Sequence, residues 1–533
     1  MSVTQPPIRD GAGFVDARTC REWLSSLPLT NIPQAQYLVL EALRGLAKDE
    51  KFDPLERLKC LELVREKVAY LQGEQRTRYF GKSLPLSSND TDTWRSSRSL
   101  LEELEAGYRR CLAAAAPGAA LESHQALISQ RIARYLGAQM LFHAIIYRRF
   151  DPALWERLHA LYAQVEAAGK ADEIVKDSLE GEDGTSSATE AYVRVVLMQA
   201  AYLSEVTAPQ MDFIAALLRL WVRRVPVKRK PAEGAGALSP LVVDLGKAIG
   251  ARPQLSSEVG ESQRVLDVEQ LSRSIRKRIH GLQNGEEPAA LGLPAEVPAS
   301  DALDQLKRVH RLWCEGAPPR PSAKVPQEKS AGLVFGLNEI HFFITGGKVF
   351  EQPDKKRELT RQEKQDIEVF GRVSERTQAM MLSELNYTVE NWSVVDEMLG
   401  AWRLMRPPTS SRGVTIGRLV AMRVGDTAPF LLGKVSALSL ETEGVIATVA
   451  LFPGKPEAVP VRAGDARNRP TAQWSQGFRL PALEKAKVPA SMVVGAGVAG
   501  RGRGVEVWDG GPKEHTVEEV LDHGTDFDRV SYF

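Results

Sequence analysis

Apolar residues recur at intervals of three and four from about residue 15 to residue 225, which is the spacing of amphipathic helices. The clearest stretch places one apolar face on Leu55, Leu58, Leu61, Val64, Val68 and Leu71. Asp53 is positioned to cap the first turn of this helix, and Pro54 stands at the first helical position, where it loses no hydrogen bond. The pattern therefore predicts an all-α N-terminal domain over residues 1–228.

The same start signal returns at Asp151 and Pro152, and Gly169 is placed to end the helix that follows. The two starts are also alike in letters, F-D-P-L-E-R-L at 52–58 and F-D-P-A-L-W-E-R-L at 150–158. Such a likeness suggests stacked helical hairpins, whereas a plain helical bundle needs no repeat. Both arrangements remain open at this point.

Two runs rich in proline and glycine divide the rest of the chain. The first, at 226–236, ends the helical region, and the second lies at 316–326. Between them the sequence predicts a strand at 241–245 and helices near 262–283 and 301–314. We therefore expect a mixed linker and helical domain over residues 237–316.

Beyond residue 320 the period changes towards two, which is typical of half-buried strands. The predicted strands are 333–337, 392–395, 402–405, 419–424, 430–435, 445–451 and 459–462. Short strands with turns between them favour a meander closed into an antiparallel barrel over residues 320–470. A β-rich C-terminal extension over 478–533 is predicted to contain strands at 491–494 and 505–508 and a helix from Thr516. The predicted fold class is α+β with several domains.

The composition is 43% hydrophobic and 26% charged, and the formal net charge is +1. So small a charge gives no global field that would attract nucleic acid or an anionic membrane. The sequence shows neither a secretory leader nor a run of about 18 apolar residues, so we expect a cytoplasmic protein without a membrane span. The four cysteines lie far apart without C-x-x-C spacing, which fits a reducing compartment and small core residues.

No motif in the chain predicts catalysis. The letters V-V-G-A-G-V-A-G at 493–500 match a dinucleotide-binding fingerprint, but R-G-R-G at 501–504 prevents the helix that such a site requires. A nucleophile elbow and an H-E-x-x-H motif are both missing, and His143 and His341 lie in apolar segments that favour a core position. We therefore predict a protein that is not an enzyme and that uses no cofactor or metal.

Two basic clusters, at 219–230 and 273–278, carry side chains that can contact phosphates. Neither cluster is interleaved with aromatic residues in the way that single-strand binders need. A solvated face or a patch that docks a protein partner is therefore favoured over nucleic-acid binding.

The segment W-S-V-V-D-E-M-L-G-A-W at 392–402, with I-G-R-L-V-A-M-R at 416–423 and L-G-K-V at 432–435, resembles PilZ domains. It is most similar to the divergent branch found in bacterial cyclic di-GMP effectors with a long helical N-terminal region. In that family an R-x-x-x-R motif precedes the first barrel strand and a D/N-x-S-x-x-G motif lies on a following strand. The resemblance implies cyclic di-GMP as a ligand, because arginine can bind guanine O6 and N7 or a phosphate, and a carboxylate accepts from the guanine edge.

Carried onto this sequence, the resemblance places the arginine motif at Arg320 and Lys324. A lysine keeps the charge but loses the bidentate fork of arginine. Arg372 and Arg376 form an alternative arginine pair after the first strand.

Asp396 matches the acidic position of the second motif, and Arg403 offers a further cation just beyond it. Met398 stands where serine is expected, and Ala401 where the last glycine is expected, with Gly400 one place early. The predicted ligand-binding residues are thus Arg320, Lys324, Asp396, Gly400 and Arg403.

These observations lead to two hypotheses. In the first, the protein is a cytoplasmic signalling effector whose PilZ-like barrel binds cyclic di-GMP and whose helical region docks a protein partner. In the second, it is a nucleotide-independent scaffold in which a degenerate barrel binds only protein. The sequence does not distinguish them.

Overall fold

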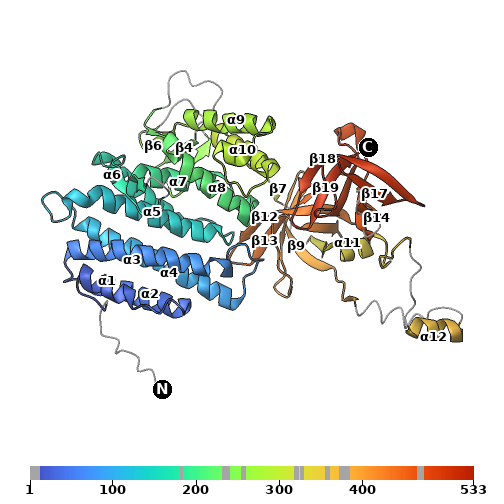
Figure 1. Ribbon diagram of the computed structural model, residues 1–533, viewed down its shortest axis with the longest axis horizontal. Helices are drawn as coiled ribbons and strands as arrows, with labels where there is room; N and C mark the ends of the chain where they lie inside the picture. Colours follow the sequence, from blue (N-terminus) through green and yellow to red (C-terminus); the bar gives the residue numbers. More distant parts are fainter. Residues whose placement is uncertain are drawn as a thin grey trace. The chain divides into compact units, whose positions relative to one another are not determined.

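The computed structural model describes residues 13–180, 184–230, 241–253, 260–316, 323–324, 329–354, 361–370, 385–425, 427–464 and 473–533. The chain divides into two compact units, Met1–Pro319 and Arg320–Phe533. The first unit is mainly helical, and the second is built mainly of antiparallel strands (Figure 1). The predicted fold class, a helical N-terminal region followed by antiparallel barrels, is confirmed.

The described part of the helical unit contains ten α-helices. They are α1 (Ala17–Ser25), α2 (Ile32–Lys48), α3 (Pro54–Gln75), α4 (Ser88–Ala113), α5 (Gln125–Ala144), α6 (Pro152–Ala167), α7 (Ala188–Ala200), α8 (Ala208–Trp221), α9 (Glu269–Gln283) and α10 (Ala299–Cys314). The long helix α4 packs against α2, α3 and α5, and α5 also packs against α7. The helices predicted from the spacing of apolar residues between about residues 15 and 225 are therefore present in the structure.

The two predicted helix starts are confirmed. The Asp53 carboxylate accepts a hydrogen bond from the amide of Glu56, and the Asp151 carboxylate accepts one from Ala153. At the other end of α6, Gly169 adopts a φ of 67°, a left-handed conformation that suits glycine. These elements follow from local chemistry, since each cap satisfies amides that the helix itself leaves unpaired.

The apolar face predicted for α3 is buried in the bundle core except at Leu55, which is partly buried. Leu58, Leu61, Val64 and Val68 are at most 3% exposed, and Leu71 is fully buried. The four cysteines are free and buried, as predicted from their spacing.

The region between residues 225 and 316 forms a small sheet followed by two helices. Its strands run in the order β3 (Val227–Lys228), β6 (Gln263–Leu266), β4 (Leu241–Asp244) and β5 (Arg252–Pro253). The helix expected near 262–283 begins only at Glu269, because residues 263–266 pair with two strands instead.

The second unit contains two closed six-stranded barrels. The first barrel uses β8 (Ser330–Phe335), β9 (Glu390–Met398), β10 (Ala401–Met405), β11 (Leu419–Val424), β12 (Leu431–Leu440) and β13 (Val445–Leu451). Its order is β8-β9-β10-β13-β12-β11, closed by the pairing of β11 with β8. A short strand β7 (Ala323–Lys324) extends the edge of β9, and α11 (Leu337–Ile344) follows β8. The prediction of a simple meander was wrong. The barrel consists of two three-stranded meanders, β8-β9-β10 and β11-β12-β13, which are joined by the pairing of β10 with β13 and of β8 with β11.

The second barrel uses β14 (Glu457–Ala463), β15 (Ser475–Leu480), β16 (Ser491–Gly495), β17 (Gly504–Trp508), β18 (Pro512–His523) and β19 (Phe527–Tyr532). The predicted strand at 459–462 therefore belongs to this barrel and not to the first. The helix predicted from Thr516 was also wrong, because this segment is β18 and pairs with β17 and β19. The glycine-rich run at 493–500 ends β16 and leads into a turn, with no helix after it.

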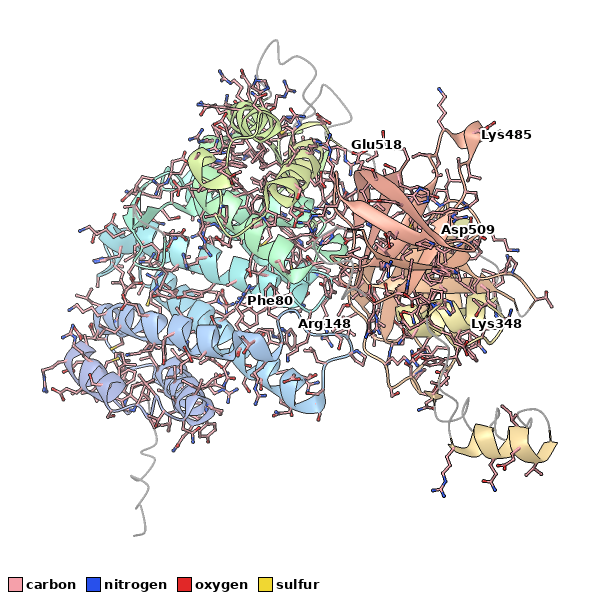
Figure 2. All side chains as sticks on the ribbon, turned by 45° about the vertical axis from the view of Figure 1, so that its right-hand side comes forward. Phe80, Arg148, Lys348, Lys485, Asp509 and Glu518 are labelled. Atoms are coloured by element: carbon pink, nitrogen blue, oxygen red, sulfur yellow. The ribbon has the colours of Figure 1, made fainter. Side chains whose placement is uncertain are left out.

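One hydrophobic cluster is common to the two barrels, and the second barrel has a further cluster of its own. Leu419 and Leu432 of the first barrel cluster with Phe478, Val493 and Phe527 of the second. The surface of the second barrel carries exposed charged side chains, including Lys485, Asp509 and Glu518 (Figure 2). Within the described ranges, no helix is long and apolar enough to cross a membrane.

Candidate ligand site on the first barrel

Three of the predicted site positions lie side by side across adjacent strands. Asp396 on β9 is the cross-strand partner of Arg403 on β10 and, on its other side, of Lys324 on β7. Residues opposite one another in antiparallel strands have Cβ atoms about 4.5–5.5 Å apart. Positions separated by 72 residues in the sequence therefore lie next to one another in the sheet.

The turn of the β9–β10 hairpin places Gly400 close to these residues. Met398 pairs with Ala401, which leaves Leu399 and Gly400 as a two-residue loop. Gly400 has a φ of 73°, a conformation that a glycine adopts without steric cost. The register shifts between Arg403 and Leu404, a bulge that bends the hairpin beside the acidic residue.

The Asp396 carboxylate is buried and only partly satisfied. Its side chain is 6% exposed, and Oδ2 lies 3.8 Å from Nη1 of Arg403, whose side chain is 27% exposed. Among the residues that the structure describes, Oδ1 has no hydrogen-bond partner. A buried acceptor without a donor costs about 1–3 kcal/mol, more when it is charged.

Arg403 forms a loose ion pair with this carboxylate. At 3.8 Å the ion pair is longer than a charge-assisted hydrogen bond of about 2.8 Å. A guanidinium has five N–H donors, so Arg403 can contact a ligand and keep its interaction with Asp396.

The arginine motif is only partly within the described residues. Arg320 lies outside them, as do the alternative residues Arg372 and Arg376. The backbone of Lys324 is described, and it pairs with Asp396 where β7 lies beside β9.

Sequence reasoning missed a second group of arginines at the other end of the hairpin. Arg412 pairs with Glu339 at 2.7 Å and lies 3.5 Å from Glu390, while Arg406 donates to the carbonyl of Arg412 at 3.0 Å. Burial lowers the pKa of Arg406. These contacts hold the loop after β10 in place and engage the guanidinium groups of both arginines, so this group has a structural role.

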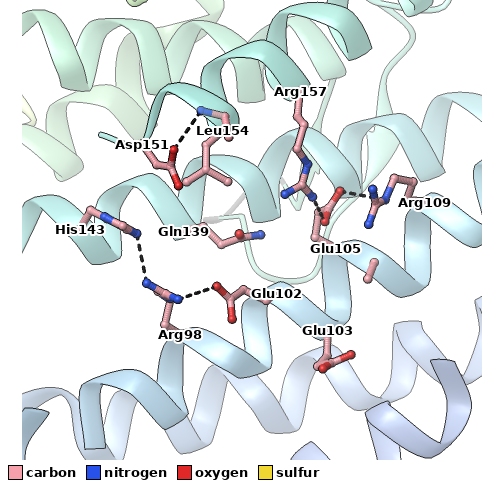
Figure 3. Close-up of a pocket in the computed structure, with 12 residues that line it drawn as sticks. Arg98, Glu102, Glu103, Glu105, Arg109, Gln139, His143, Asp151, Leu154 and Arg157 are labelled. Atoms are coloured by element: carbon pink, nitrogen blue, oxygen red, sulfur yellow. Dashed lines mark hydrogen bonds and ion pairs between the residues drawn. The ribbon is translucent and has the colours of Figure 1, made fainter. Parts of the chain in front are cut away.

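A different hollow lies in the helical unit, among α4, α5 and the start of α6 (Figure 3). Its volume is about 350 Å³. Its lining residues are Arg98, Glu102, Glu103, Glu105, Ala106, Arg109, Gln139, His143, Asp151, Ala153, Leu154 and Arg157. His143 was expected to be a core residue but is half-buried beside this hollow, where Nη1 of Arg98 lies 3.4 Å from its Nε2. His341 is buried, as expected.

The helical unit also contains a buried ion network around Asp177. Its carboxylate is fully buried and contacts Arg65, Arg131 and Arg134. Burial opposes the ionisation of Asp177, but the three arginines outweigh it and lower the pKa to about 2. This network joins the loop after β1 (Val175–Lys176) to α3 and α5.

The family model that matches this chain falls on the helical unit. Residues 18–232 match the family model described as "Cyclic-di-GMP receptor FimW, N-terminal domain". The helical unit is thus similar to the N-terminal domain of a cyclic-di-GMP receptor. A curated protein from Pseudomonas aeruginosa, named cyclic-di-GMP receptor FimW, is 23% identical over 354 residues. This match covers 65% of the present chain and 56% of that protein, so the chain spans little more than half the length of its relative.

Proposed function

We propose that this protein is a signalling effector that binds cyclic di-GMP through its first, PilZ-like barrel. The similarity to a protein named as a cyclic-di-GMP receptor supports the class of ligand. The observation that carries the site is the shared register of Lys324, Asp396 and Arg403, with an unsatisfied buried oxygen on Asp396.

In this proposal each side chain has one task. The Asp396 carboxylate accepts from the N–H groups of the guanine edge, and Arg403 donates to guanine O6 and N7 or to a phosphate. Gly400 adds no side chain to its half of the hairpin loop, so the ligand can approach the backbone there. Arg320 and Lys324 supply the positive charge for the phosphates.

The protein would transmit a signal by binding and not by catalysis. A ligand changes a conformational equilibrium only when it has different affinities for the two states. We propose that the helical unit docks the protein partner that responds to such a change, in a cytoplasmic setting.

Isothermal titration calorimetry of the full chain with cyclic di-GMP tests the site. We expect saturable binding, and we expect Asp396→Asn and Arg403→Met each to weaken it by about 10- to 100-fold, since a hydrogen bond to a charged group contributes about 1.5–3 kcal/mol. Asp509→Asn and Arg503→Met are the matched controls, because both residues are exposed on the second barrel. Their affinities should equal that of the parent.

Two results would contradict the proposal. No heat at tens of micromolar ligand would favour the alternative function, a nucleotide-independent scaffold. Parent-like binding by both Asp396→Asn and Arg403→Met would mean that the ligand binds elsewhere.

A further inference from the structure

The hollow in the helical unit carries polar atoms that the protein itself leaves unsatisfied. Gln139 on α5 is 3% exposed, and its Nε2 has no hydrogen-bond partner among the described residues. Figure 3 shows its carboxamide in the middle of the lining, between Arg98 and Glu102 on one side and Arg157 and Glu105 on the other. The Nε atom of Arg157 is also buried without a partner in the described part of the chain.

An unpaired amide group in this position is costly unless something fills the hollow. A buried donor without an acceptor costs about 1–3 kcal/mol. A hollow of about 350 Å³ lies within the range of about 300–1,000 Å³ that small-molecule sites occupy. Both observations point to a small polar ligand.

The charges of the lining are already paired within the protein. Arg98 contacts Glu102 at 2.9 Å, and Glu105 contacts Arg157 and lies 3.6 Å from Arg109. Glu103 lies 3.5 Å from Arg44, outside the lining, and the Asp151 carboxylate caps α6.

His143 adds no positive charge to this balance. Burial, followed by the nearby Arg98, lowers the pKa of the imidazole, so it is neutral at pH 7. With no excess of positive charge, the hollow does not suit a phosphate, and its paired charges and unpaired amide favour an uncharged group rich in hydrogen-bonding atoms.

We propose that this hollow is a guanine-binding pocket. The guanine edge presents the O6 acceptor beside the N–H donors at N1 and N2, a pattern that no other base shares. The Gln139 amide and the Arg157 Nε–H donate to O6 and N7, and the Glu102 carboxylate accepts from N1 and N2. The pocket lies in another unit than the barrel site, so the proposal holds whether or not the barrel binds cyclic di-GMP.

The arrangement favours guanine over adenine for a physical reason. Adenine has an amino donor where guanine has O6, and it has an acceptor at N1 where guanine has a donor. Adenine would therefore place its N1 acceptor against the Glu102 carboxylate and would lack the N2 donor, whereas the Gln139 carboxamide, which carries both a donor and an acceptor, can pair with either base. Sites built to hydrogen-bond one pattern discriminate strongly, because the wrong ligand leaves buried groups unpaired.

Guanosine is the probe, because it carries no phosphate and therefore does not depend on the cations of the barrel. Calorimetry on the full chain should show one guanosine bound and at least about tenfold weaker binding of adenosine. Gln139→Leu removes the buried amide and should weaken guanosine binding at least about tenfold. Gln164→Leu is the matched control, because Gln164 is exposed on α6 outside the lining, and its affinity should not change.

Glu102→Gln provides a second variant that does not depend on the buried Gln139. The side chain of Glu102 is 40% exposed, so the fold tolerates the change, while the loss of a charged acceptor should again weaken guanosine binding. A thermal melt of each variant confirms that it is folded.

Three results would overturn the proposal: no saturable guanosine binding at millimolar concentration, equal binding of adenosine, or parent-like affinity in both Gln139→Leu and Glu102→Gln. Loss of guanosine binding in Asp396→Asn would also overturn it, because the nucleoside would then bind at the barrel. If Asp396→Asn loses cyclic di-GMP binding and keeps guanosine binding, both proposed sites are supported. If this variant binds cyclic di-GMP as the parent does, only the barrel site is contradicted.

Discussion

The backbone amide of Leu419, at the start of β11, donates a 2.8 Å hydrogen bond to Oδ1 of Asp526, just before β19. Beside it, the amide of Thr525 donates to the carbonyl of Gly417 at 2.8 Å, and Lys434 pairs with Asp522 at 2.6 Å. These contacts join the two barrels at the edge of their common hydrophobic cluster. The barrels are therefore expected to unfold together.

Asp526 makes this joint sensitive to pH. Burial raises the pKa of the Asp526 carboxyl above its usual value, because a buried charge is less well solvated than an exposed one. A raised pKa in the folded state means that the stability from this group is fully present below the unfolded pKa of about 3.9 and is lost as pH rises through the folded pKa. Ionisation of the Asp526 carboxyl therefore makes the folded state less stable.

Asp526→Asn should be at least as stable as the parent at pH 7, because the amide oxygen still accepts from Leu419 and no charge is buried. The difference should shrink towards pH 4. Asp526→Ala, by contrast, should lose about 1–3 kcal/mol, because the Leu419 amide loses its acceptor. Urea unfolding at several pH values measures the stability of the parent and of both variants. A stability difference between Asp526→Asn and the parent that grew larger in acid would contradict the raised pKa of Asp526.

Asp177 should show the opposite dependence on pH. Its pKa of about 2 lies below the unfolded value, so the stability from its ionisation is present above about pH 4 and is lost as the pH falls towards 2. Arg65→Met should cost about 3–5 kcal/mol, because it leaves a buried charge without a main partner. Denaturant unfolding of the helical unit within the full chain measures both effects.

The exposed ion pair of Arg76 with Asp212 is the control for that experiment. Both side chains are 43% or more exposed, so Asp212→Asn should cost less than about 1 kcal/mol. Equal losses from Arg65→Met and Asp212→Asn would show that burial does not set the strength of the Asp177 network.

Gly400→Ala should destabilise the β9–β10 hairpin by about 1–2 kcal/mol through backbone conformation alone. No heavy atom lies within 4 Å of the added Cβ, but the φ of 73° disfavours any residue with a side chain. Gly73→Ala is the contrasting change, because Gly73 lies within α3 with equal space around it and should gain about 0.8–1 kcal/mol. Thermal melting distinguishes the two, and shifts of the same sign would contradict this account.

Gly433→Ala should disrupt the first barrel for a steric reason. A Cβ at Gly433 would lie 2.4 Å from the carbonyl oxygen of Ala450 on the paired strand β13, and a backbone atom there cannot move without breaking the ladder. We expect a loss of about 3 kcal/mol, measured by urea unfolding. Gly511→Ala, in the turn before β18, has open space and should change stability by less than about 0.5 kcal/mol.

The features that the sequence predicted well depend on short-range chemistry. Asp53 and Asp151 cap helices because a carboxylate three or fewer residues before a free amide is always close to it. Asp396 was predicted within the second motif and Arg403 just beyond it, and the two-residue turn between their strands makes them cross-strand partners. Proximity in sequence determines proximity in space in both cases.

The wrong predictions concern segments whose structure is set by distant partners. Residues 516–523 have apolar residues at helical spacing, yet they form a strand that pairs with β19 through two register shifts, and Thr516 also pairs with β17. Closing the barrel leaves no free edges, and this gain outweighs the local preference. For the same reason the strand at 459–462 pairs in the second barrel and not in the first.

The sequence by itself determined the helices and their caps, most of the strands and the candidate acidic residue Asp396, because each depends on a few neighbouring residues. Only the tertiary structure decided the order of strands in the two barrels, the pairing of Lys324 with Asp396 and the pocket around Gln139. The pocket gathers side chains from α4, α5 and α6, and no periodicity within one helix indicates which faces of three helices meet. Such sites arise from packing, in which the burial of apolar surface selects one arrangement of the elements from many.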